Sequence, residues 1–177
     1  MIRILDIFFS ILGLTFLSPI LIFLWFIGLS DNGSPLFMQK RVGRNIKSFI
    51  LIKFRSMPIK TRSAGTHLIK NVKLTSFGNF LRKTKLDEIP QLFNVLLGDM
   101  SLVGPRPCLL NQRKLIKERK KRGVFKVKPG ITGLAQISGV TMKNPTLLSK
   151  MDLKMIKEMS LFYYIYYILK TVLQIIR

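Results

Sequence analysis

The chain has 177 residues, which is enough for one modest domain and too few for two. It holds 30 Lys and Arg residues against 8 Asp and Glu residues, a formal net charge of +22, and 48% of its residues are hydrophobic. This charge favours a polyanionic partner such as nucleic acid, an anionic membrane or a phosphorylated substrate. Combined with high hydrophobicity, it is typical of the cytoplasmic face of a membrane and argues against a soluble nucleic-acid binder.

Two residue types that often carry chemistry occur once each. Cys108 is the single cysteine, so an internal disulfide is excluded and a reducing compartment is indicated. We interpret Cys108 as a small buried hydrophobe rather than a reactive thiol. His67 is the single histidine, and without a second histidine or a cysteine pair a zinc site is not expected.

An uncharged apolar run occupies residues 7–29 and is long enough to cross a bilayer core of roughly 30 Å as one helix. Asp6 and the lack of a small-residue cleavage site argue against a cleaved signal peptide. Pro19 cannot donate to the carbonyl of Thr15, and the Ser18 hydroxyl can bond back to a freed carbonyl, so a bend is expected there. Each half is then roughly 17 Å long and cannot cross alone.

Two topologies therefore stay open, a single span and a re-entrant helix that enters and leaves by one face. The residues alone slightly favour the span, because many spanning helices tolerate a proline. In either case 29 of the 30 basic residues follow the run, which places the body of the protein in the cytoplasm. We divide the chain into a membrane-inserted segment, residues 1–30, and a cytoplasmic domain, residues 31–177.

The next segments predict a small hairpin and several helices. Turn residues occupy 31–35, and two strands are expected within 36–54 around Gly43-Arg44-Asn45. The remaining expectations are a polar loop over 58–72, a largely helical stretch over 75–97 that is interrupted near Pro90, a loop over 99–107, a basic helix over 109–122, a glycine-rich loop over 128–139, and helix from 150 to the end.

The last helix contains LFYYIYYIL at 161–169, which is too short and too aromatic for a confident span. Tyrosines prefer the headgroup level of a membrane, so an interfacial amphipathic helix is favoured over a helix packed on a soluble core. The predicted fold class is α+β and mainly helical, with a membrane helix, a small hairpin and interfacial helices around a compact cytoplasmic domain.

The stretch KLDEIPQ, residues 85–91, places two acids side by side in a very basic chain. A helix starting near Thr84 would make Asp87 a capping-box partner, whereas a start just before Pro90 would put that proline at the first helical position. Either register puts Asp87 and Glu88 near a helix N-terminus, where negative charge is favoured. Ordinary acids at a helix start, balanced by nearby cations, are therefore one interpretation.

A catalytic interpretation uses the same acids. An ionised carboxylate can attack phosphorus to form an acyl phosphate, and cations must then neutralise the repulsion between the two anions. Arg106, framed by two prolines, suits a bidentate phosphate contact. The candidate cations are Lys53, Arg55, Arg82 and Arg106.

Three blocks resemble the bacterial sugar transferases, the monotopic phosphoglycosyl transferases: LFMQKRVGRN…KFRSM, KLDEIPQLFNVLLGDMSLVGPRP and VKPGITGLAQISG. The resemblance covers nearly the whole chain, and the short length of the chain resembles the minimal members of that family. It implies transfer of a sugar-1-phosphate from a nucleotide sugar, usually a UDP-sugar, to polyprenyl phosphate, with release of UMP, at the start of glycoconjugate or polysaccharide assembly.

The resemblance also implies roles for residues. Asp87 would be the nucleophile of a covalent phosphosugar intermediate, Glu88 would assist, and the two would hold Mg²⁺. Substrate contacts fall to Lys53, Arg55, Arg82, Arg106, Gly130 and Gln136. The family uses a Ser-Pro break, here Ser18-Pro19, for a re-entrant helix, and this reverses the preference for a span. The implied setting is the cytoplasmic face of a bacterial inner membrane, with membrane lipids as partners, no nucleic acid and no obligate protein partner.

Several positions depart from the family pattern. Lys85 stands where Ser is usual, Leu134 where Trp is usual, and Val140 follows Gly139 where Arg is usual. A common Tyr-Tyr pair is Lys154-Met155, and the late aspartate falls near Tyr164. Two alternatives remain besides the transferase: a membrane-tethered basic protein that binds anionic lipid or nucleic acid without catalysis, and an inactive relative.

Overall fold

The computed structural model describes residues 1–59 and 74–176, and the predicted loop at 58–72 lies almost wholly outside them. Its longer helices are α1 (Ile2–Asn32), α2 (Ser76–Lys83), α3 (Gln91–Leu97), α4 (Arg113–Lys121), α6 (Pro145–Glu158) and α7 (Leu161–Ile176). The short helices are η1 (Arg44–Ile46), η3 (Leu86–Glu88), η4 (Val124–Lys126) and α5 (Leu134–Ile137), and the strands are β1 (Leu36–Val42), β2 (Ser48–Phe54), β3 (Ser101–Val103) and β4 (Gly130–Thr132). The predicted mainly helical α+β class is confirmed.

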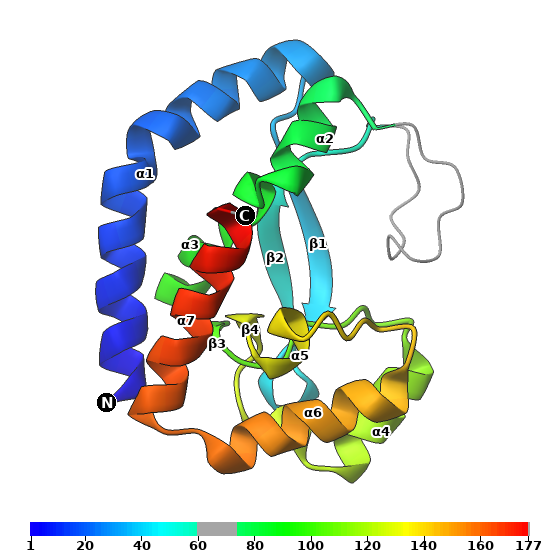
Figure 1. Cartoon of the computed structure of the whole chain (residues 1–177). Helices are drawn as coiled ribbons and strands as arrows, with labels where there is room; N and C mark the ends of the chain where they lie inside the picture. The colour runs from blue at the N-terminus through cyan, green and yellow to red at the C-terminus, as the bar shows by residue number, and fades with distance from the viewer. Residues whose placement is uncertain (60–73, 177) are drawn as a thin grey trace.

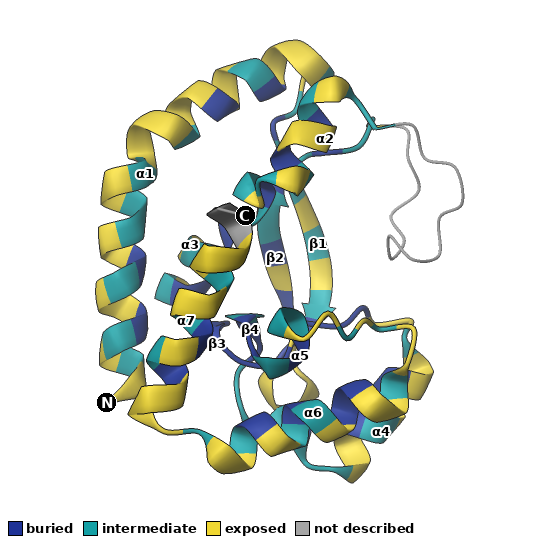
Figure 2. Ribbon diagram, viewed as in Figure 1, coloured by how far each residue is buried: buried dark blue, intermediate teal, exposed yellow. Residues whose placement is uncertain are grey.

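Helix α1 is long and apolar enough to cross a membrane by length and composition. It runs unbroken through Pro19, and the Ser18 hydroxyl donates to the carbonyl of Thr15 at 2.8 Å, as expected for a proline bend. Figure 1 shows α1 as an arch whose two ends both return to the rest of the chain. Most of its side chains are exposed (Figure 2), and its buried residues lie toward the two ends: Asp6, Ser10, Leu24 and Gly28.

The start of α1 is held by polar contacts. The Arg3 guanidinium donates to the carbonyls of Val95 and Leu96, which are end carbonyls of α3. One oxygen of the buried Asp6 carboxylate accepts from the Ser101 hydroxyl at 2.9 Å, the Leu102 amide at 2.8 Å and the Tyr164 hydroxyl at 2.7 Å. The first turns of α1 are therefore bound to α3, β3 and α7.

The end of α1 is held by packing. Leu24 joins a cluster with Phe54 of β2 and Leu81 of α2. A Cβ on Gly28 would lie 2.9 Å from the Pro35 side chain, so glycine allows the helix to pass close to the strand entry.

The hairpin prediction is confirmed. Strands β1 and β2 pair antiparallel from Leu36 opposite Phe54 to Val42 opposite Ser48. The connection includes two residues with positive φ, Asn45 and Ile46, which close the turn that follows Gly43.

The stretch over 75–97 is helical as predicted, and its interruption settles the register. Thr75 caps α2 by accepting from the amide of Gly78. Helix α2 ends at Thr84, whose hydroxyl donates to the carbonyl of Phe80, so of the two alternative registers the helix start near Thr84 is not the one found. Helix α3 begins after Pro90, and η3 lies between the two helices, following Lys85 in a left-handed conformation with φ 59°.

Two segments predicted as loops contain a small sheet, and these predictions are corrected. Strand β3, within 99–107, pairs in parallel with β4, within 128–139, and α5 follows β4. Strands of three residues flanked by Gly and Pro carry no readable alternation. The basic helix begins at residue 113 rather than 109, because residues before it form a turn, and the C-terminal helix begins at 145 and breaks after 158.

Helix α7 has two different faces. Tyr164 and Tyr167 are buried in a core with Phe49, Leu51 and Met100. The opposite face is exposed, as the exposed segments of α7 in Figure 2 show, and it carries the large apolar side chains Phe162, Leu169 and Leu173. The core-packed alternative is thus correct for one face, and interfacial binding by the other face stays a prediction.

Cys108 is fully buried against Val42 and Leu115, which confirms its interpretation as a small hydrophobe. Burial also raises the pKa of its thiol.

Candidate active site

The acidic pair lies in η3, between the end of α2 and the start of α3. Asp87 is 5% exposed, and its side chain makes no hydrogen bond to any residue that the structure describes. Glu88 instead accepts from both terminal nitrogens of Arg106, at 2.5 and 3.5 Å. Within the part of the chain that the structure describes, the Asp87 carboxylate thus has no hydrogen-bond or ion-pair partner, whereas Glu88 is held by the guanidinium of Arg106.

Lys53 reaches the pair from the end of β2. Asn94 of α3 forms two hydrogen bonds with the backbone of β2. Its side chain donates to the carbonyl of Ile50 at 2.7 Å and accepts from the amide of Ile52 at 3.0 Å, in the pattern that a neighbouring strand would make. This fixes α3, and the acids just before it, against the strand that carries Lys53.

Arg82 reaches the pair from α2. Its Nε donates to the buried Ser56 hydroxyl at 2.9 Å. A Cβ on Gly78 would stand only 2.2 Å from the Ser56 carbonyl, so glycine is required for α2 to approach this segment. Ser56 and Gly78 were not among the predicted site residues, although Ser56 belongs to the KFRSM block.

The electrostatics of the two acids are opposite. Burial, and secondly the charge of Glu88, raise the pKa of Asp87, while Lys53 and Arg82 lower it in part. Burial also acts to raise the pKa of Glu88, but the ion pair and hydrogen bond with Arg106 outweigh it, and the pKa lies below its ordinary value. Burial lowers the pKa of Lys53, against the attraction of both acids.

Arg106 follows β3 in the loop between Pro105 and Pro107. The strand pairing beneath it is tight: a Cβ on Gly130 would stand 2.0 Å from the amide nitrogen of Gly104. The Gly130 amide donates to the carbonyl of Pro105 at 3.0 Å. Gly130, a predicted substrate contact, thus shapes the loop that carries Arg106, and it also lines a small pocket with Lys53 and Arg106.

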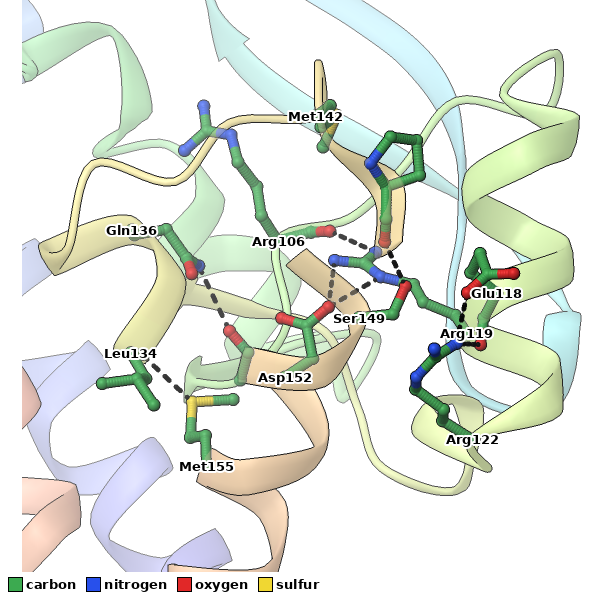
Figure 3. Close-up of polar contacts among 12 residues, drawn as sticks. Arg106, Glu118, Arg119, Arg122, Leu134, Gln136, Met142, Ser149, Asp152 and Met155 are labelled. Atoms are coloured by element: carbon green, nitrogen blue, oxygen red, sulfur yellow. Dashed lines mark hydrogen bonds and ion pairs between the residues drawn. The ribbon is translucent and has the colours of Figure 1, made fainter. Parts of the chain in front are cut away.

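A buried ion pair fixes this loop from behind (Figure 3). Arg119 of α4 and Asp152 of α6 are paired through Nη2 at 2.8 Å and Nε at 2.9 Å, with side chains 2% and 1% exposed. Arg119 Nη1 donates to the carbonyl of Arg106 at 2.7 Å. In Figure 3 the Arg106 side chain extends away from this contact, so the pair holds the backbone and leaves the guanidinium for Glu88.

Arg41 of β1 is a further cation that the sequence reasoning missed. It lines the same small pocket as Lys53 and Arg106. Burial, and then the charge of Arg106, lower its pKa to about 10. Its Nε is buried without a hydrogen-bond partner among the described residues. An anion placed between Arg41 and Arg106 would relieve this repulsion.

Two of the predicted substrate contacts, Arg55 and Gln136, differ in where the structure places them. Arg55 lies over the Phe37 ring, 5.4 Å from its centroid, and donates to the carbonyls of Ser34 and Leu36, so the structure does not bring it to the acids. Gln136 lines a cavity beside Glu88 and Arg106, and its amide donates to the carbonyl of Gly104 at 3.2 Å.

The donor set fits a magnesium ion shared with substrate. Mg²⁺ is commonly held by one or two carboxylates together with substrate phosphates. Asp87 and Glu88 are adjacent carboxylates, and within residues 1–59 and 74–176 no group of three His, Cys, Asp or Glu could hold a metal by itself. These two acids would hold the ion together with phosphate oxygens.

The amino-acid sequence is similar to a known protein family and to several named proteins. A family model described as bacterial sugar transferase matches residues 1–177. An undecaprenyl-phosphate galactose phosphotransferase of Salmonella typhimurium is 40% identical over 154 residues, covering 77% of this chain and 32% of the relative. A UDP-glucose:undecaprenyl-phosphate glucose-1-phosphate transferase of Escherichia coli is 40% identical over 179 residues, covering 94% of this chain and 38% of the relative.

A shorter relative, the uncharacterized sugar transferase EpsL of Bacillus subtilis, is 45% identical over 138 residues, covering 77% of this chain and 68% of the relative. This chain thus spans about a third of the length of the Salmonella and Escherichia proteins.

Proposed function

This chain belongs to the bacterial sugar transferase family, and on that premise we propose that it transfers a sugar-1-phosphate from a UDP-sugar to a polyprenyl phosphate, releasing UMP. Relatives named for undecaprenyl-phosphate galactose and glucose-1-phosphate transfer support the donor and acceptor classes. The observation that carries the chemistry is Asp87, a buried carboxylate without a hydrogen bond among the described residues, beside Lys53 and Arg82.

The reaction has two displacements at one phosphorus. An ionised oxygen of Asp87 attacks the phosphorus that bears the sugar, the bond to the bridging pyrophosphate oxygen breaks, and UMP leaves with that electron pair. An oxygen of the polyprenyl phosphate then attacks the same phosphorus and releases the Asp87 carboxylate. Lys53 and Arg82 reduce the repulsion between carboxylate and phosphate.

Glu88 and Arg106 position the phosphates. The Arg106 side chain is 44% exposed, so its remaining donors are available while Glu88 holds its orientation. Mg²⁺ bound at Asp87 and Glu88 would neutralise charge on the pyrophosphate. Because the pKa of Asp87 is raised, the rate of the donor step should increase as rising pH ionises this carboxylate.

The test of this function is UMP release from UDP-sugars. Asp87→Asn should abolish transfer, because an amide cannot form the acyl phosphate, whereas the exposed Glu158→Gln should match the parent. Without acceptor, the parent should gain the mass of a phosphosugar on the peptide that contains Asp87. Activity of Asp87→Asn within a few-fold of the parent would exclude the covalent step.

The same proposal includes a re-entrant α1, with both ends on the cytoplasmic side. Its support is that Arg3 and Asp6 at one end and Leu24 at the other contact the same body as the acids. A straight helix would separate Arg3 from Leu24 by about 30 Å, which is roughly the thickness of a bilayer core. The acceptor phosphate then meets Asp87 at the surface where its lipid chain leaves the bilayer.

Topology can be tested with a single cysteine near Met1 in a Cys108→Ser background. A reagent that cannot cross the inner membrane should label it only after the cells are permeabilised. Pro19→Ala with Ser18→Ala should straighten the helix and favour labelling from outside. Outside labelling of the parent would establish a span instead.

A further inference from the structure

A cavity of about 350 Å³ opens directly beside Glu88 and Arg106. Its walls are mostly aliphatic and come from three parts of the fold: Ile89 and Leu92 beside the acids, Ile131 and Ile137 around β4 and α5, and Ile168 and Val172 of α7. Lys85, Glu88 and Arg106 supply its charged groups, Thr132, Gln136, Thr171 and Gln174 add uncharged polar groups, and most of the remaining wall is aliphatic.

Helix α7 is tied over this space by side chains near its end. The Thr171 hydroxyl bonds to that of Thr132, and Gln174 donates to the carbonyl of Ile137 at 2.9 Å. The neighbouring Leu169 and Leu173 are 57% exposed on the outer, apolar face of the same helix. The cavity thus lies between Glu88, the neighbour of Asp87, and a helix whose outer face suits lipid.

We infer that this cavity, which we call the α7 cavity, binds the first prenyl units of the acceptor, with the acceptor phosphate at Arg106 and Lys85. The inference rests on the proposed function and locates the second substrate within it. The wall is mostly aliphatic, so many of the polar groups of a nucleotide or sugar would remain unpaired there, beyond those that Gln136 and Gln174 could meet. A prenyl chain matches the aliphatic walls, and its phosphate matches the two cations.

Burial of the prenyl chain in the α7 cavity should strengthen binding of the acceptor. Each buried methylene-sized group strengthens binding by about fourfold. Acceptor recognition should therefore depend steeply on the wall of the cavity, whereas donor recognition, which proceeds through Lys53 and Arg82, should not.

The test compares Val172→Trp with Leu173→Trp. Both positions are exposed aliphatic residues of α7, but only Val172 lines the cavity. Val172→Trp should raise the acceptor KM at least tenfold, slow acceptor-independent UMP release less than twofold, and weaken binding of polyprenyl phosphate measured in detergent without donor. Leu173→Trp should leave all three values near those of the parent.

Three results would overturn the inference. An unchanged acceptor KM and affinity in Val172→Trp would show that the chain binds elsewhere. Equal defects in the two variants would indicate general disturbance of membrane contact. A donor step slowed as much as the full reaction would assign the cavity to the donor. If the parent releases no UMP without acceptor, the covalent mechanism fails, yet donor-free binding still decides the α7 cavity.

Discussion

Removing Asp152 should destabilise the protein by leaving a charge buried. The Arg119 side chain is 2% exposed, and a guanidinium does not give up its proton inside a protein. In Asp152→Leu this cation has lost its partner, which costs about 3–5 kcal/mol. For a chain of this size each kcal/mol moves Tm by roughly 2–4 °C, so Tm should fall by about 6–20 °C.

The double variant Arg119→Met with Asp152→Leu separates stability from positioning. Replacing both charges with apolar groups should restore Tm to near the parent value, because no buried charge remains. It should not restore activity, because the carbonyl of Arg106 has lost the Arg119 donor at 2.7 Å. We expect kcat to stay roughly tenfold to a hundredfold low, as for a small misplacement of a catalytic group.

The assay is thermal unfolding in one detergent, paired with UMP release at saturating donor and acceptor. A Tm for Asp152→Leu within about 2 °C of the parent would contradict the buried-charge reasoning. Full kcat in the double variant would show that the Arg119 contact does not position Arg106.

Further outcomes follow from the acids and their neighbours. Because the pKa of Asp87 is raised on folding, its contribution to stability is lost as the pH rises through that pKa; Asp87→Asn should therefore raise Tm at pH 7, and a lower Tm would refute this. Lys53→Gln removes a charge that lowers the pKa of Asp87, so the acid limb of the rate of UMP release should move to higher pH; a limb that stays in place contradicts that coupling. Arg106→Lys keeps the charge but loses the fork to Glu88, and should lower kcat/KM at least tenfold in steady-state assays; parent-like kinetics would exclude bidentate binding. Asn94→Leu leaves the amide of Ile52 and the carbonyl of Ile50 without their partner and should destabilise by about 1–3 kcal/mol, seen as a lower Tm; no change would mean that α3 is held by packing alone.

The parts of the site that could be predicted lie within short segments. Asp87 and Glu88 stand out as adjacent acids in a basic chain, Arg106 stands between two prolines, and the hairpin that ends near Lys53 shows alternation around a turn. Each of these signals lies within a short segment, so it can be recognised in the sequence without knowledge of the fold.

The missed residues act through partners distant in the chain. Arg119 is one of several cations in a basic helix, and only its pairing with Asp152, 33 residues later, distinguishes it. Asn94 looks like a helix residue until its partners on β2, 42 and 44 residues earlier, are known. Two departures from the family pattern are also neighbours, since the Leu134 amide lies 3.3 Å from the sulfur of Met155 (Figure 3). No periodicity of either segment encodes such a pairing.

The three hydrogen bonds to Asp6 set an order of events during synthesis. Their donors emerge from the ribosome long after Asp6 itself, and Tyr164 lies 158 residues further along the chain. At ordinary rates of translation that interval is roughly ten to thirty seconds. Under the membrane insertion proposed for α1, its apolar residues can enter the bilayer during this interval, whereas the Asp6 carboxylate lacks its donors Ser101, Leu102 and Tyr164. The start of α1 therefore reaches its full set of polar contacts only after α7 has been synthesised, because Tyr164 of α7 supplies the third donor to Asp6.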